Sequence, residues 1–447
     1  MGLFSSEEVG LGTITLSMKI AATRHWSMLF KAFAATLIGL ILVHPVFAQS
    51  ESEEPADDAD DAEVLEDLDI DVQGSLDDVE EKRGIAVDGD LRLGYVFAGE
   101  DIQGIVSSDS GHLRSRWRLR SVWGISERFR AVGRVSGICS ANDCDPDFIF
   151  QPDIPTKVGL SDGQITIDSL FFQWFRTEKF NVAVGRMETK FVARGGVYAK
   201  SLDRNDSNNL RINWTDGLQT SYKANNGWNS NLIVQHNSSD GPSNVRRSPL
   251  NFSESGSRVS TFVGFENVQP KRRLVQRAFD ISYLPSSLKK NGVETEPAVD
   301  YWAVVARAAA RWPKRSEGWR LRFSSEVGYA PETPTKLASG IVGSGDAGGL
   351  AWNVTASIME FLPNHSIGVN YAETEAGWLI SPQYADNERL WEIRYMWRPT
   401  ERLTLDVRGR WRDDLTQRIF DDPDRDRFDF YARLTWSFTA RGFANDE

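Results

Sequence analysis

Residues 427–438, near the C-terminus, alternate strictly between apolar and polar side chains. Because successive side chains of a β-strand point to opposite faces, six apolar residues from Phe428 to Phe438 share one face, while Asp429 and Arg433 fall on the other. The apolar face is aromatic at both ends, and the polar face carries charge. A soluble sheet could bury such a face, but this combination is typical of a strand with lipid on one side and water on the other.

The same alternation recurs along most of the chain. We count sixteen segments: 85–97, 113–123, 129–137, 165–175, 180–186, 218–222, 228–236, 259–265, 275–283, 302–312, 319–329, 352–358, 367–371, 391–397, 403–411 and 427–438. Short turns, such as 124–127 and 399–401, follow the even-numbered segments, and long polar loops, such as 138–163 and 331–349, separate them. Transmembrane β-barrels show this asymmetry, with tight periplasmic turns, long external loops and both termini in the periplasm.

The sequence therefore predicts an all-β protein, a 16-stranded antiparallel transmembrane β-barrel over residues 83–438, with a C-terminal extension at 439–447. A hydrophobic content of 40% and a mean hydropathy of −0.39 exclude a bundle of membrane helices but fit a barrel, because half of each barrel strand is polar. The fourth segment breaks the pattern, since Asp168 falls in phase with Leu170, Phe172 and Trp174. We expect a bulge or a different register there.

The N-terminus resembles an export signal. Basic residues precede an apolar run at 33–43, and Val46-Phe47-Ala48 supplies the small residues of a cleavage site, so we expect residues 1–48 to be a lead and signal peptide. Residues 49–82 follow, and 51–82 hold sixteen acidic residues, one basic residue and no aromatic residue. Such a segment cannot bury enough apolar surface to fold alone, which favours a mostly disordered periplasmic tail. Alternatively, its carboxylates dock on a positive lumen as a plug or counterion.

The two cysteines, Cys139 and Cys144, are close enough in sequence to close a small ring, so we predict a disulfide. A metal site with Asp143, Asp145 and Asp147, or free thiols, are the alternatives.

Arginines gather on the predicted inner face. In the second segment His112 is followed at alternate positions by four arginines, and the third, eleventh and fifteenth segments add more: Arg114, Arg116, Arg118, Arg120, Arg130, Arg134, Arg320, Arg322, Arg408 and Arg410. One interpretation is structural, namely that these arginines pair with lumen carboxylates such as Asp88, Asp90, Asp406 and Asp429. The other is functional: the column offers successive binding positions to anions, because a guanidinium stays charged and binds carboxylate or phosphate oxygens bidentately.

Two features resemble the phosphate-selective porin O and P type of bacterial outer-membrane porin. Val182-Ala-Val-Gly-Arg186, with Thr189 and Phe191, is similar to the segment by which that family's fifth strand enters its third external loop, and the arginine column resembles its arginine ladder. Residues 427–438 also resemble the closing strand of outer-membrane barrels. The resemblance implies a homotrimer in which loop 188–212 folds inward. That would bring five basic residues towards the channel: Lys190, Arg194, Lys200, Arg204 and Arg211.

We therefore expect a porin in the outer membrane of a Gram-negative bacterium, in contact with its lipid. It would pass small hydrophilic solutes by passive diffusion and prefer anions such as phosphate or carboxylate. The alternative is a channel for acidic oligo- or polysaccharides, with Phe171, Phe175 and Tyr301 as stacking surfaces. Catalysis is not expected, because the mature chain would hold three histidines and no catalytic motif, and neither a cofactor, a metal ion nor a nucleic acid is predicted as a partner.

Overall fold

The computed structural model describes most of the chain from Gly84 onward, all of it within one compact unit. The described residues are 84–102, 106–141, 143–150, 160, 162–206, 212, 214–236, 248–250, 259–270, 272–293, 295–312, 318–419 and 425–443. The predicted signal peptide (1–48) and acidic segment (49–82) lie outside them. Within these ranges no helix is long and apolar enough to cross a membrane.

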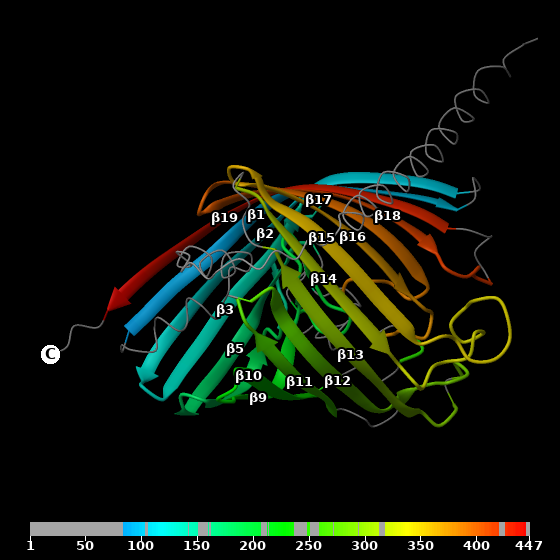
Figure 1. Cartoon of the computed structure of the whole chain (residues 1–447), viewed down its shortest axis with the longest axis horizontal. Helices are drawn as coiled ribbons and strands as arrows, with labels where there is room; N and C mark the ends of the chain where they lie inside the picture. The colour runs from blue at the N-terminus through cyan, green and yellow to red at the C-terminus, as the bar shows by residue number, and fades with distance from the viewer. Residues whose placement is uncertain are drawn as a thin grey trace, which may run out of the picture. The chain divides into compact units, whose positions relative to one another are not determined.

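Sixteen long strands form one closed sheet in which each strand is antiparallel to the next in the chain, and β19 pairs with β1 (Figure 1). They are β1 (Gly84–Ile102), β2 (Val106–Ser126), β3 (Phe129–Ser140), β5 (Gln164–Thr177), β6 (Phe180–Met187), β9 (Thr215–Lys223), β10 (Trp228–His236), β11 (Val259–Val268), β12 (Leu274–Leu288), β13 (Val299–Arg311), β14 (Arg320–Tyr329), β15 (Leu350–Leu362), β16 (His365–Thr374), β17 (Glu388–Thr400), β18 (Leu403–Asp414) and β19 (Arg425–Phe443). Three two-residue strands complete the set: β4 (Asp147–Phe148), β7 (Ala193–Arg194) and β8 (Ala199–Lys200). The predicted 16-stranded antiparallel barrel is confirmed, and its last strand runs five residues past Phe438.

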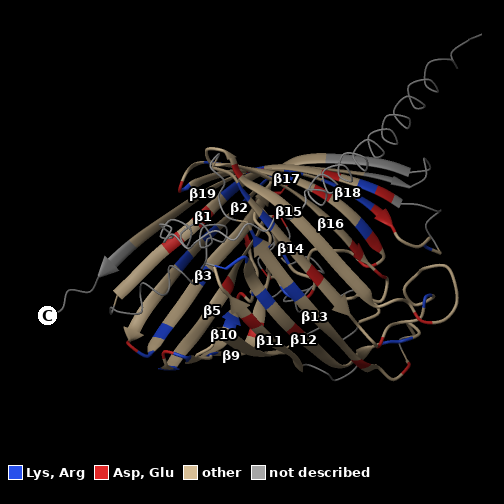
Figure 2. Ribbon diagram, in the orientation of Figure 1, with Lys and Arg blue, Asp and Glu red and all other residues tan. Residues whose placement is uncertain are grey.

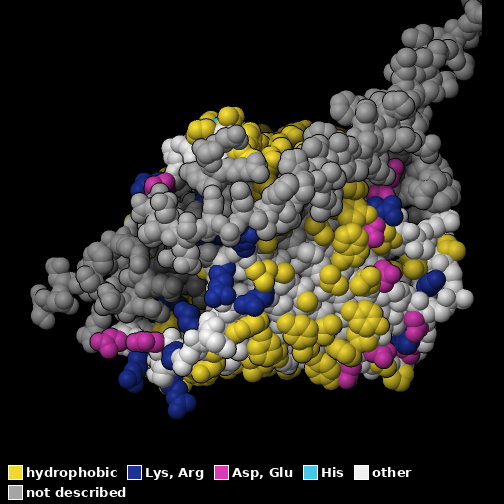
Figure 3. Space-filling view, in the orientation of Figure 1, with side chains coloured by type: hydrophobic (Ala, Val, Ile, Leu, Met, Phe, Trp, Pro, Cys, Tyr) yellow, Lys and Arg dark blue, Asp and Glu magenta, His cyan; other side chains and the backbone are white. Residues whose placement is uncertain are grey.

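The period-two pattern separates the two faces of the wall as the sequence predicts. In β2, Leu113 and Leu119 are 62% and 47% exposed, whereas Arg116 and Arg118, at alternate positions, are 0% and 6% exposed. Figure 3 shows apolar side chains forming a broad band along the visible part of the wall, with Asp and Glu side chains mostly towards its two ends. The outer face is therefore apolar and the inner face polar, which is the arrangement of a barrel surrounded by lipid.

Asp168 in β5 shows how the chain keeps this arrangement. Arg134 of β3 pairs with Ser169, and the next residue, Val135, pairs with Ile167, so Asp168 is the extra residue of a β-bulge. The bulge turns Asp168 inward, where it is fully buried, and leaves Leu170 exposed on the outer face. The irregularity expected in the fourth segment is confirmed.

Both ends of the described chain lie at the end of the barrel that carries the short turns. Gly84 pairs with Gly124, next to the turn between β2 and β3, and also with Phe443. The other short turns lie at this same end, because antiparallel neighbours reverse direction at every connection. We call this end the short-turn rim.

Candidate functional site: an arginine wall inside the barrel

Closure of the barrel brings β17, β18, β19, β1, β2 and β3 together as six consecutive strands. Their inward positions carry thirteen arginines, which we call the arginine wall. They are Arg92, Arg114, Arg116, Arg118, Arg120, Arg130, Arg134, Arg394, Arg408, Arg410, Arg412, Arg427 and Arg433. Figure 2 shows bands of both signs of charge on the strands around β18. Eight of the ten arginines predicted from sequence therefore lie together.

The other two predicted arginines lie elsewhere. Arg320 and Arg322 belong to β14, three strands from β17. Arg320 forms an ion pair with Glu360 at 2.8 Å, and Arg322 lies directly opposite Arg311 of β13. These residues form a separate basic group at the short-turn end of β13 and β14.

Carboxylates are interleaved with the arginine wall. Arg120 donates to Asp88 at 2.6 Å, and Arg116 donates to Asp90 at 3.0 Å. Two further carboxylates also pair with arginines of the wall: Asp406 accepts from Arg394 and Arg433, and Asp429 accepts from Arg410. These four are the carboxylates that the structural interpretation of the sequence named. The arginine column is thus an alternating network of charge rather than a bare row of cations.

Arginines nevertheless outnumber the acids that they meet. Among the residues that the structure describes, eleven arginines of the wall form ion pairs with eight carboxylates: Asp88, Asp90, Asp162, Asp168, Glu188, Glu388, Asp406 and Asp429. Of the other two, Arg130 donates to Gln173 and Arg408 lies 4.6 Å from the ring centre of Tyr431. The wall therefore carries a net positive charge.

The loop that follows β6 begins inside this wall. Its first residue, Glu188, accepts from Arg134 at 2.7 Å and lies 3.7 Å from Arg118. Asp168, turned inward by its bulge, binds Arg134 through two hydrogen bonds of 2.9 Å. Burial alone would raise the pKa of Glu188, but Arg134 and Arg118 lower it to about 2. Glu188 is therefore an ionised counterion at neutral pH.

From Glu188 the loop crosses to the opposite inner wall and follows it as the β7–β8 hairpin. The backbone N–H of Arg194 donates to Gln276 of β12 at 2.9 Å, and that of Val197 donates to Ser357 of β15 at 3.3 Å. The Tyr198 hydroxyl donates to the Gly368 carbonyl of β16 at 2.9 Å. At Gly195 a Cβ atom would lie 2.2 Å from Thr355 Oγ1, so only glycine lets the hairpin lie this close to the wall.

The five basic residues predicted for this loop separate into different roles. Lys200 pairs with Glu392 of β17 at 2.6 Å, at the edge of the arginine wall. Arg204 is buried and donates to Thr189, Thr215 and Gln235, so it fastens the base of the loop. Lys190 is exposed and Arg194 is half-buried, whereas Arg211 lies outside the described residues. Burial lowers the pKa of Lys200 to about 8, with Glu392 opposing and Arg408 and Arg410 adding to the effect.

A buried ionic cluster fixes the far side of the loop. Arg307 of β13 binds Asp203 of the loop at 3.1 Å, Asp280 of β12 at 2.6 Å and Glu326 of β14 at 2.9 Å. All four side chains are 1% exposed or less. We call this cluster the Arg307 latch. Sequence reasoning missed it, although a charge at an inward position in the middle of the alanine-rich segment 302–312 was the available signal.

A second loop, residues 375–387, packs against the first inside the barrel. Trp378 Nε1 donates to the Leu202 carbonyl at 3.0 Å, and the Tyr301 hydroxyl donates to the Gly377 carbonyl at 3.0 Å. Leu379 and Ile380 join them in an apolar cluster with residues of β12 to β17. The two loops therefore occupy the inner side of β12 to β16 and meet the edge of the arginine wall at β17.

The aromatic residues proposed for sugar stacking do not share a surface. Tyr301 is fully buried in that apolar cluster, and Phe171 packs against Val122 and Val132. Phe175 lies 4.7 Å from the guanidinium of Arg130. The three rings therefore have three separate environments.

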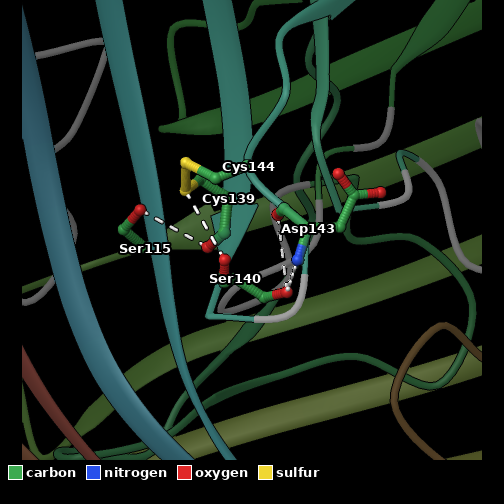
Figure 4. Close-up of a disulfide and its surroundings, with 5 residues drawn as sticks. All are labelled: Ser115, Cys139, Ser140, Asp143 and Cys144. Atoms are coloured by element: carbon green, nitrogen blue, oxygen red, sulfur yellow. Dashed lines mark hydrogen bonds between the residues drawn. A yellow bond between two sulfur atoms is a disulfide. The ribbon is translucent and has the colours of Figure 1, made fainter.

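Cys139, near the end of β3, forms a disulfide with Cys144 in the following loop (Figure 4). The Cα atoms are 4.5 Å apart, Ser115 donates to the Cys139 carbonyl, and Ser140 accepts from the Asp143 N–H. A disulfide leaves no thiolate for the alternative metal site. The disulfide closes a short ring at the start of the loop that follows β3, and this ring contains none of the arginines of the wall.

These observations define the class: a closed barrel of sixteen antiparallel strands with an apolar outer face and a charged inner wall. The fold is similar to that of OprB from Pseudomonas putida, with a TM-score of 0.51 and 11% sequence identity over 82% of this chain and 97% of that one. OpdQ from Pseudomonas aeruginosa and a BenF-like porin from Pseudomonas fluorescens Pf-5 each align with 79% of this chain and 99% of their own, at 14% identity and TM-scores of 0.46 and 0.45. No family model and no curated protein matches the chain.

Proposed function

We propose that this chain is an outer-membrane porin that passes small hydrophilic solutes by diffusion and prefers anions such as phosphate or carboxylate. Solutes would pass between the arginine wall and the two inner loops, with the short-turn rim facing the periplasm. The selectivity of this chain would resemble that of the phosphate-selective porin O and P type, and it would form the homotrimer that this resemblance implies. Sedimentation of the detergent-solubilised chain tests the trimer.

One cluster in β17, β18 and β19 carries the anion preference. Arg394 and Arg433 share a single carboxylate, that of Asp406, at 2.6 Å each, and Arg408 lies directly opposite Arg394 in the register. Like charges placed opposite each other on neighbouring strands destabilise a sheet. An anion beside these three arginines would offset their repulsion, because the two nearby carboxylates, Asp406 and Glu392, face four cations when Lys200 is counted with the three arginines.

Donors in this cluster are also available to such an anion. Arg408 Nε, Arg433 Nε, Arg433 Nη1 and the Tyr431 hydroxyl are buried and have no hydrogen-bond partner among the described residues. Tyr431 lies between the two guanidinium groups, 4.6 Å from Arg408 and 5.2 Å from Arg433. Buried donors without partners cost free energy, and an oxyanion supplies the acceptors that they lack.

The reversal potential across a planar bilayer with a tenfold potassium chloride gradient tests the proposal. We expect anion preference in the native channel, and an anion-to-cation permeability ratio lower by up to roughly 30-fold in the double variant Arg408→Gln, Arg433→Gln, since each of the two charges contributes about 1 kcal/mol at 4 Å in water. The matched control is Arg277→Gln, an exposed arginine of the outer face. Heat-modifiable migration on gels would establish that each variant is folded, and cation preference in the native channel would reject the proposal.

A further inference from the structure

The short-turn rim is basic. Among the described residues, its turns expose six basic side chains, Arg128, Lys179, Lys223, Arg272, Arg273 and Arg402, against three exposed acidic ones, Glu127, Glu178 and Glu401. Figure 3 shows Lys and Arg side chains projecting at the lower left of the molecule, where β2 ends in Figure 1. We call the six basic residues the basic rim.

In the part of the chain that the structure describes, the loops at the opposite end of the barrel expose or half-expose more carboxylates than cations, although Lys290 lies near Glu332 and Asp346, and Arg418 near Asp386. These carboxylates include Glu332, Asp346, Glu375 and Asp386. In Figure 3, Asp and Glu are more numerous towards the right of the molecule. A polyanion would therefore be attracted to the short-turn rim and repelled from the opposite end.

The chain contains such a polyanion in the sequence directly before the first strand. Residues 51–82 hold sixteen acidic residues and one basic residue, and they precede Gly84, which pairs with Gly124 at the turn between β2 and β3. We propose that residues 51–82 bind the basic rim as an intramolecular partner, their carboxylates pairing with its Lys and Arg side chains.

The length of residues 51–82 and their high effective concentration at the rim favour this segment over a partner in solution. Thirty-two residues extend to about 100 Å, whereas sixteen tilted strands spaced about 4.8 Å apart enclose a barrel roughly 30 Å wide. Every turn of the rim is therefore within reach. A tether of this length holds its charges near the rim at an effective concentration on the order of millimolar, which a separate polyanion in solution would have to match.

Photo-crosslinking of the full-length mature chain tests the proposal. A photoreactive residue replaces Leu68, inside the acidic segment, and the cross-linked peptides are mapped. We expect cross-links to the turns at 127–128, 178–179 and 269–273 in 0.15 M salt, and a several-fold loss in 1 M salt, where charges are screened beyond about 3 Å.

Two variants isolate the charge. Replacing all sixteen acidic residues of the segment by their amides keeps its length and should abolish the cross-links to the rim. Arg272→Glu with Arg273→Glu should reduce cross-linking at that turn and leave the turn at 178–179 as the control. Cross-links mapping to the long loops, no cross-link at all, or equal cross-linking by the amide variant would each overturn the proposal. None of these measurements depends on ion selectivity, so failure of this inference is distinguishable from failure of the proposed porin function.

Discussion

Replacing Arg307 by leucine should detach the inner loop from the far wall. In the native latch one guanidinium compensates three carboxylates that are 1% exposed or less. Removing one member of a buried ion pair costs about 3–5 kcal/mol, because the remaining charge stays buried and unpaired. Asp203, which belongs to the loop, can escape to water only if the loop moves away from β13.

The size of the effect follows from the contacts that remain. The hydrogen bonds of Arg194, Val197 and Tyr198 still hold the hairpin, and each contributes about 1 kcal/mol net. A loss of about 3 kcal/mol is as large as the contribution of these three hydrogen bonds together and shifts the docking equilibrium by roughly 150-fold. The loop would then exchange between docked and undocked positions.

Single-channel recording tests this directly. We expect the Arg307→Leu channel to show a higher mean conductance and large current fluctuations, and Arg307→Lys, which keeps the charge, to show a smaller change. Adding Asp280→Asn and Glu326→Gln to Arg307→Leu removes two of the buried carboxyl groups that have lost their cation and should restore a quiet channel. A folded Arg307→Leu channel with native conductance and native noise would refute the reasoning.

Three further predictions concern Glu188, Lys200 and the disulfide. Glu188→Gln removes one negative charge beside Arg118 and Arg134, so the anion-to-cation permeability ratio should rise by up to about fivefold, as about 1 kcal/mol at 4 Å allows; a fall in the reversal-potential measurement would contradict this. Because burial lowers the pKa of Lys200 to about 8, raising the pH from 7 to 9 removes its positive charge and should weaken anion preference, whereas Lys200→Arg should abolish this pH dependence; an equal titration in both channels would exclude Lys200 as its source. Replacing both cysteines by serine opens a ring with a sequence separation of 5, so denaturant unfolding should show a loss of at most about 2 kcal/mol with selectivity unchanged, and a larger loss would indicate that the disulfide also organises the loop beyond it.

The strands were predictable because each carries its own period-two signal. The segment 302–312 alternates without a break, and the structure forms β13 over Val299–Arg311. Even the irregularity at Asp168 was predictable from the sequence. A carboxylate at a position that would face lipid has no stable place there unless a bulge turns it inward. The alternation and its interruption at Asp168 both depend only on residues that are close together in the sequence.

The assembled arginine wall was only partly predictable. Sequence reasoning placed Arg433 on the polar face of its strand but did not group it with Arg408 and Arg410, although Arg433 and Arg394 share Asp406. That contact depends on the registers of three strands, which no single segment encodes. Trp378 shows the same limit, because its partner, the Leu202 carbonyl, lies 176 residues away in the sequence.

The pairing of the first strand with the last has a consequence for biogenesis. Nineteen residue pairs, from Gly84 with Phe443 to Ile102 with Arg425, join segments at opposite ends of the polypeptide. This seam cannot form until translation of the final strand is complete, and until then both edges offer unpaired backbone groups that invite aggregation. Since the arginine wall straddles the seam, the inner surface that would attract anions is assembled in the last step of folding, and a chain cut short before Arg425 would lack it.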